Sequence, residues 1–278
     1  MLAAGQGQAE SQYEGVFGAG YFASDTSSLS GPIIHANMIA RPASGVTLRF
    51  SLSHALENGG NTATIGALEV TGAIGGGYSL GGYTRMERNS SIGRIPEQGD
   101  TYGLVLRKDL GNTQAFVRVG QTHHIGTRIW FTTPQVYDYF LDEVALGISR
   151  DVSDRFSYAM RLDLTGEVFR KRNVFRSTVF MASGAALYEP RPGFWINGSL
   201  GYGTSRWGDG LIASIGGSID VGKRSGVPMK FVADLVHVED LTIGQSSDSA
   251  FLGIEIEFGG AERRIPSQSY AAGIFDQY

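Results

Sequence analysis

The sequence contains no cysteine. This absence excludes disulfide bonds, a thiolate nucleophile, and zinc or iron sites with cysteine ligands. An unbroken apolar run of about 18 residues is also missing, so the sequence predicts no transmembrane helix. Charge is sparse, since Asp, Glu, Lys and Arg make up 18% of the chain and the net charge is −4. Acidic and basic residues are interleaved and leave no basic face for a phosphate backbone, so we expect no nucleic-acid partner.

Glycine, in contrast, is abundant, with 40 residues in a chain of 278. This density disfavours long helices. The apolar residues are spread through the chain with a period of two, which places successive side chains on opposite faces of a β-strand. Within residues 155–168, one face carries Phe156, Tyr158, Met160, Leu162 and Leu164, and the other carries Arg155, Ser157, Ala159, Arg161 and Asp163. The pattern predicts amphipathic strands.

Clusters of Gly, Pro, Asn, Asp and Ser divide this pattern into strands. The predicted strands exceed the usual length of about 5 to 6 residues in soluble sheets and match the roughly 9 to 11 tilted residues that cross a bilayer. We therefore predict an all-β fold, a closed antiparallel transmembrane β-barrel of fourteen strands, with twelve or sixteen as alternatives. The predicted strands lie near residues 14–23, 33–41, 46–55, 63–74, 76–86, 101–109, 114–122, 136–150, 155–169, 174–188, 192–203, 209–221, 228–239 and 248–258.

The predicted connections alternate between tight and long. The long ones occupy residues 24–32, 57–63, 87–100, 122–135 and 240–248. Such parity is typical of periplasmic turns and extracellular loops, and it places both termini on the periplasmic side. Two further external connections, 170–173 and 204–208, are short and weaken this argument.

A single domain is the simplest organisation. Residues 1–13 are predicted to be a leader or periplasmic segment, 14–258 the barrel, and 259–278 a periplasmic tail or plug segment. The small residues among the first ten resemble the end of a cleaved signal, with cleavage after Ala9, and an ordinary flexible leader is the alternative.

Segments such as RDVSDRFSYAMRLDLTGEVF and LRKDLGNTQAFVRVGQ resemble the strand pairs of bacterial outer-membrane β-barrel proteins. The resemblance covers residues 14–258 and lies at the level of the superfamily. It implies residence in the bacterial outer membrane. Proteins of this kind include solute channels, translocator domains, polysaccharide-export barrels and a few lipid-modifying enzymes.

The histidines offer no clear catalytic pair. His54 lies on the face opposite Ser51 and Ser53 in a strand, and the adjacent His123 and His124 fall in a predicted external connection, where their side chains point apart. We therefore predict no catalytic residue, no metal site and no cofactor. His35 and His237 are predicted to lie within strands as packing or lumen residues.

The polar face of the strands remains as the candidate working surface. Charged side chains cannot face lipid cheaply, so we expect them to line the lumen. Whether that lumen is open or blocked by ion pairs is left undecided by the sequence. The candidates are Arg49, Glu69, Arg85, Arg107, Arg118, Glu143, Arg161, Asp163, Glu167, Arg176, Asp220, Asp234, Glu255 and Glu257.

The leading functional hypothesis is a non-enzymatic barrel that conducts small hydrophilic solutes or helps to export a polymer. Its expected partners are outer-membrane lipids and that solute or polymer. Two alternatives are an outer-membrane lipid-modifying enzyme, which needs a Ser/His pair on the outward face, and a soluble structural β-protein.

Overall fold

The computed structural model describes residues 13–25, 30–56, 60–90, 97–130, 133–169, 174–205, 208–222 and 227–259. At residues 127–130, 133–137, 139, 167–169, 174–178 and 205 it describes the backbone alone. The predicted leader and C-terminal tail thus lie almost wholly outside the described residues.

Fourteen strands form one closed antiparallel barrel, which confirms the predicted fold class. Each strand corresponds to one predicted from the period-two pattern. The strands are β1 (Tyr13–Ser24), β2 (Gly31–Ala43), β3 (Val46–Leu56), β4 (Thr62–Gly75), β5 (Tyr78–Ser90), β6 (Glu97–Asp109), β7 (Thr113–Trp130), β8 (Thr133–Ser153), β9 (Phe156–Phe169), β10 (Val174–Arg191), β11 (Phe194–Ser205), β12 (Gly208–Asp220), β13 (Met229–Asp240) and β14 (Gln245–Phe258).

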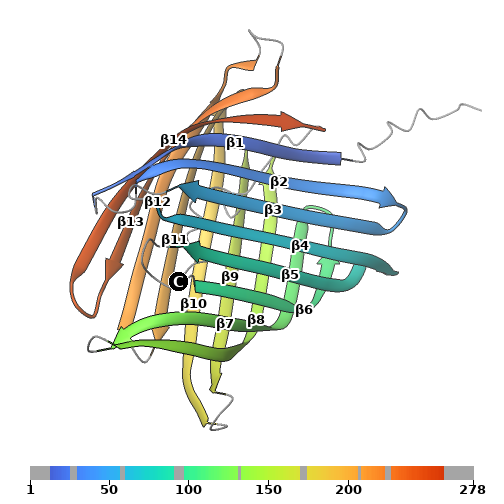
Figure 1. The fold of residues 1–278 in the computed structure, drawn as a ribbon. Coiled ribbons are helices and arrows are strands. Elements are labelled where there is room, and N and C mark those ends of the chain that lie inside the picture. The colour runs from blue at the N-terminus through green and yellow to red at the C-terminus, as the bar shows by residue number, and fades with distance from the viewer. Residues whose placement is uncertain are drawn as a thin grey trace, which may run out of the picture.

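Every strand pairs with its neighbours in the chain, and the barrel closes where β1 pairs with β14. The closing register runs from Gly15 opposite Phe258 to Ser24 opposite Ser249. Figure 1 shows this closure as the first and last strands lying side by side, in blue and red. Because β1 pairs with β14, the sheet has no edge strand whose backbone N–H and C=O groups lack a neighbouring strand.

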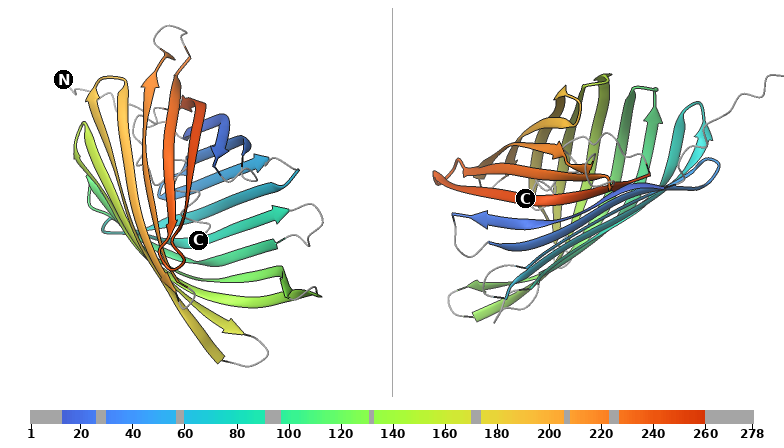
Figure 2. Two further views of the ribbon diagram at one scale, coloured as in Figure 1. Left: turned by 90° about the vertical axis from the view of Figure 1, so that its left-hand side faces the viewer. Right: turned by 90° about the horizontal axis from the view of Figure 1, so that it is seen from above.

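The barrel has two walls whose strands run at a steep angle to each other. Strands β2 to β6 form one wall, and β8 to β12 lie across the barrel from them (Figure 2). Strands of a closed barrel tilt by about 35 to 45° from its axis, so strands on opposite sides cross steeply.

The two ends of the barrel differ in their connections. At the turn end, where β1 begins and β14 ends, the β10–β11 hairpin turns through Pro192 and Gly193. Gly193 has a φ of 82°, a left-handed value that glycine adopts without the steric cost that a Cβ would bring. The backbone N–H of Gly193 also donates to the Glu189 carboxylate at 2.8 Å. The opposite end, which holds the connections after β1, β3, β5, β7, β9, β11 and β13, is called the loop end below.

At the loop end the strands are longer than predicted. The predicted connection 122–135 is strand on both sides, since β7 continues to Trp130 and β8 starts at Thr133. The predicted connection 240–248 contracts to a turn at 241–244. Polar residues such as His123 and Ser246 interrupt the outward positions in these extensions, so the apolar alternation that reveals a strand in the sequence is broken there. His123 and His124 consequently lie in β7.

The two faces of the barrel wall differ in chemistry. Large apolar side chains at alternate positions remain exposed on the outside, as Leu235 (60%) and Leu252 (66%) illustrate. Their chain neighbours Val236 (3%) and Phe251 (1%) are buried on the other face. Within the described residues there is no helix long and apolar enough to span a membrane.

Candidate functional site

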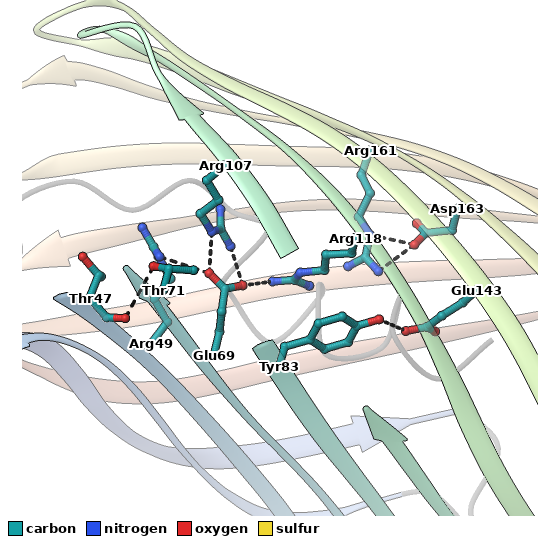
Figure 3. A network of polar contacts seen from close by, with 10 residues as sticks. All are labelled: Thr47, Arg49, Glu69, Thr71, Tyr83, Arg107, Arg118, Glu143, Arg161 and Asp163. Atoms are coloured by element: carbon teal, nitrogen blue, oxygen red, sulfur yellow. Dashed lines mark hydrogen bonds and ion pairs between the residues drawn. The ribbon is translucent and has the colours of Figure 1, made fainter. Parts of the chain in front are cut away.

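Glu69 on β4 is the centre of a charged network on the wall made by β3 to β9. Its carboxylate accepts from Arg49 Nη1 at 3.1 Å, from Arg118 Nη2 at 2.8 Å, and from both Nε and Nη2 of Arg107, the latter at 2.7 Å. Glu69 itself is only 4% exposed. Figure 3 shows the three guanidinium groups converging on this one carboxylate.

The strand order places this network on the concave side of the sheet. The three arginines come from β3, β6 and β7, and β4 is separated from β7 by two intervening strands. A direct contact between Glu69 and Arg118 must therefore cross over β5 and β6 on the inner surface. The period of two along each strand then assigns the remaining side chains to the inner or the outer face.

Aromatic rings hold the arginines in place. The guanidinium groups of Arg107 and Arg118 lie 5.2 and 5.0 Å from the centre of the Phe116 ring, and Arg118 lies 5.3 Å from that of Tyr83. These are cation–π distances. The Tyr83 hydroxyl donates to the Glu143 carboxylate across the same face (Figure 3). The network is thus continuous from β3 to β8.

A glycine makes room for the Tyr83 ring. A Cβ added at Gly120 would lie 2.3 Å from Tyr83 Oη, whereas one added at Gly184 would meet nothing nearer than 3.8 Å. We expect Gly120→Ala to push the ring off Glu143 and to lower the free energy of unfolding by about 1 to 3 kcal/mol, a typical cost of overpacking. Urea unfolding in lipid vesicles measures this loss. Gly184→Ala is the matched control, and an equal loss in both variants would contradict the steric explanation.

Two other acidic residues in the described part of this wall each pair with an arginine of their own strand. Arg161 donates from Nε and Nη2 to Asp163 at 2.9 and 2.6 Å, and Arg85 forms an ion pair with Glu87. Glu69 is the exception, because three arginines share it.

A second polar cluster occupies the inner face across β11, β13, β14 and β2. His35 Nε2 lies 2.9 Å from Glu255 Oε1, and Asn197 donates to Asp234 at 2.9 Å. The Asn197–Asp234 contact skips β12, so this cluster also lies on the concave side. His35 and Asp234 are 7% and 3% exposed.

Towards the turn end, Lys230 pairs with Glu257 at 2.6 Å and lies over the Trp195 ring at 3.7 Å. Asp220 accepts from the backbone N–H of Gly222 at 2.8 Å.

The structure therefore brings most of the sequence candidates into contacts. The side chains of Glu167 and Arg176 lie outside the described part. Sequence reasoning did not select Tyr83 or Phe116, which complete the network. Their position could have been found from parity, since Phe116 lies two residues before Arg118 on the same face.

Polar side chains on the outer face gather near the loop end. His54 Nδ1 lies 2.7 Å from Thr64 Oγ1, and His123 Nε2 lies 2.9 Å from Asp138 Oδ1. His54 is five residues from Arg49, and His123 is five from Arg118, so both point outward. The outer collar comprises these and the other paired outward residues: His54, Thr64, Arg88, Asp100, Gln121, His123, Asp138, Asp142, His237 and Asp248.

Solved structures of similar shape are membrane barrels. An OmpT variant from the outer membrane of Vibrio cholerae, lacking loop L8, matches with a TM-score of 0.53 and 11% identity, over 88% of this chain and 98% of its own. The anion-selective porin from Comamonas acidovorans matches with 0.53 and 10%, over 88% and 98%. The Pseudomonas putida toluene transporter TodX matches with 0.51 and 9%, over 89% of both chains.

The fold resembles that of bacterial outer-membrane β-barrels. No protein-family model matches the sequence, and no curated protein does. At such low sequence identity, the similarity between this chain and the outer-membrane barrels concerns the fold alone.

Proposed function

We propose that this chain is a bacterial outer-membrane channel through which small hydrophilic solutes pass. The observation that carries the proposal is the division of a closed barrel wall into an exposed apolar outer face and a charged inner face. Export of a polymer through the same lumen remains the nearest alternative.

The outer face supports a place in lipid. Large apolar side chains that are half exposed or more recur around the barrel, among them Leu104 (60%), Leu200 (56%), Ile215 (62%) and Leu252 (66%). Soluble monomers rarely expose contiguous apolar surface of this extent, because it associates with other apolar surface. A bilayer covers it completely.

The inner face supports a polar lumen. Glu69 and its three arginines would be costly against hydrocarbon but are well placed in a hydrated pore. We propose that the charged residues predicted from the sequence line this pore. The collar and the loop end then face the outside of the cell. The turn end, where β1 begins and β14 ends, faces the periplasm.

The comparisons support passage in preference to catalysis. The similar structures include proteins described as a toluene transporter, a monoaromatic hydrocarbon channel and an anion-selective porin. The exposed apolar side chains argue against a soluble structural β-protein.

Two measurements on the purified chain test the proposal. A barrel folded in detergent should migrate faster on a denaturing gel before boiling than after it. Liposomes that contain the folded chain should release a small hydrophilic dye but retain a large dextran. The boiled protein is the matched control for leakage.

The outcomes separate the membrane barrel from the channel. A gel shift without dye release would refute passage of small solutes while leaving the barrel in place. Full solubility in plain buffer without any gel shift would refute both.

A further inference from the structure

We infer that Arg49, Arg107 and Arg118 form an anion-binding subsite that receives the carboxylate or phosphate group of a passing solute. The inference rests on the proposed channel and specifies the class of solute that it favours. It depends on three observations: the donors, the charge and the accessibility of this one cluster.

The arginines have many more donors than their shared acceptor can use. Each guanidinium presents five N–H groups, and a carboxylate offers about four acceptor positions. Glu69 accepts four hydrogen bonds, two at each oxygen, and is therefore saturated. Among the described residues, no other hydrogen bond is formed by these three guanidinium groups. Roughly eleven N–H groups are left over. The Nε of Arg118 is buried, and the exposed groups among the others can donate to water or to an incoming anion.

The same stoichiometry leaves a local surplus of positive charge. Three guanidinium groups around one carboxylate carry a net charge of +2, whereas Arg161 with Asp163 and Arg85 with Glu87 carry none. Arginine forks match the planar, bidentate geometry of carboxylate and phosphate oxygens. An anion can therefore supply the acceptors that the protein itself does not.

The cluster is held firmly and remains open to solvent. Hydrogen bonds to Glu69 hold all three guanidinium groups. The Phe116 ring also contacts those of Arg107 and Arg118, and the Tyr83 ring contacts that of Arg118. The side chains of Arg49 and Arg118 are still 26% and 25% exposed, so a solute in the lumen can reach them. A preorganised site of this kind binds without first having to order its own side chains.

The acidic residues across the barrel have partners of their own. Glu257 pairs with Lys230, Glu255 contacts His35, and Asp234 accepts from Asn197. On the wall of the arginines, Glu143 accepts from the Tyr83 hydroxyl, so among these contacts Glu69 is the carboxylate that the three arginines share.

Chloride current through the channel in a planar bilayer, titrated with inorganic phosphate, tests the inference. We expect phosphate to reduce the current in a saturable manner. In Arg107→Gln, which removes a bidentate donor, the half-blocking phosphate concentration should rise about tenfold, the effect of losing one charge-assisted hydrogen bond. Arg49→Gln removes a single contact with Glu69 and serves as a second variant if Arg107→Gln fails to fold.

Arg161→Gln is the matched control, because it removes an arginine of the same wall that is paired with its own carboxylate. Its block by phosphate should be unchanged. A current that phosphate does not block, or an equal loss in the control, would overturn the subsite while leaving the channel intact.

If the folded barrel carries no current, the channel proposal fails and the subsite is tested by stability. Phosphate should then raise the temperature at which the folded form disappears from the gel. The rise should be equal in the unmodified chain and in Arg161→Gln and should be smaller in Arg107→Gln at the same phosphate concentration. Absence of such a rise would overturn the subsite as well.

Discussion

Glu69→Gln should destabilise the barrel by about 3 to 5 kcal/mol, the usual cost of removing one partner from a buried ion pair. The substitution keeps the size of the side chain but removes the only carboxylate among three guanidinium groups. The amide retains one oxygen acceptor and turns an N–H donor towards arginine donors. The three arginines then repel one another around a buried side chain that no longer carries a compensating charge.

Urea unfolding in lipid vesicles, followed by the loss of the faster gel band, measures this change. Asp163→Asn provides the control, because that carboxylate accepts from Arg161, does not take part in the convergence on Glu69, and is 15% exposed. We expect it to cost less than half as much. Equal losses of unfolding free energy in the two variants would show that the convergence of three arginines on Glu69 adds nothing to the stability of the barrel.

Leu252→Arg should impair membrane assembly by about 2 to 4 kcal/mol, as an arginine near the middle of the bilayer does on the lipid face of a barrel. Leu252 lies midway along β14 and is 66% exposed. A guanidinium there would face hydrocarbon, and its side chain is too far from either end of the strand to reach water easily. The measured quantity is the yield of heat-modifiable barrel on folding into vesicles.

Ser246→Arg is the control for depth, since it places the same charge on the same outer face of the same strand, beside the collar. Near the interface an arginine costs only about 0 to 1 kcal/mol. Similar folding yields for the two variants would contradict the position proposed for the bilayer. A soluble protein would tolerate both substitutions.

The fourteen strands could be predicted from the sequence because one physical cause produced the signal. Where one face of a strand is apolar and the other polar, side chains alternate, as Phe156 to Leu164 do against Arg155 to Asp163. The strand number and the closed antiparallel topology follow from counting such segments.

The alternation of apolar and polar side chains did not reveal the parts of the strands that extend beyond the apolar band. Towards the loop end, polar residues such as Gln121 and His123 interrupt the apolar outward positions of β7, and the strand then looks like a connection in the sequence. The prediction therefore ended β7 near residue 122, whereas it continues to Trp130.

The charged network could be predicted only as a set of residues. Parity places Glu69 and Arg118 on polar faces but does not say that they meet, because their contact depends on the register and curvature of four strands. The roles of Tyr83 and Phe116 were missed for a related reason. Parity places an aromatic residue on the polar face, but it does not say which guanidinium group the ring will contact.

The collar has a consequence for the membrane itself. On β14 the apolar outward positions run from Ala250 to Phe258, about 27 Å along the strand at roughly 3.4 Å per residue. A tilt of about 40° shortens this to roughly 20 Å along the membrane normal, which is less than the roughly 30 Å of a typical hydrocarbon core. In the proposed outer-membrane setting, lipid of that typical thickness would have to thin to meet the barrel, so we expect bilayers with shorter acyl chains to suit it best. Hydrophobic mismatch thus makes the thickness of the membrane a determinant of the barrel's stability.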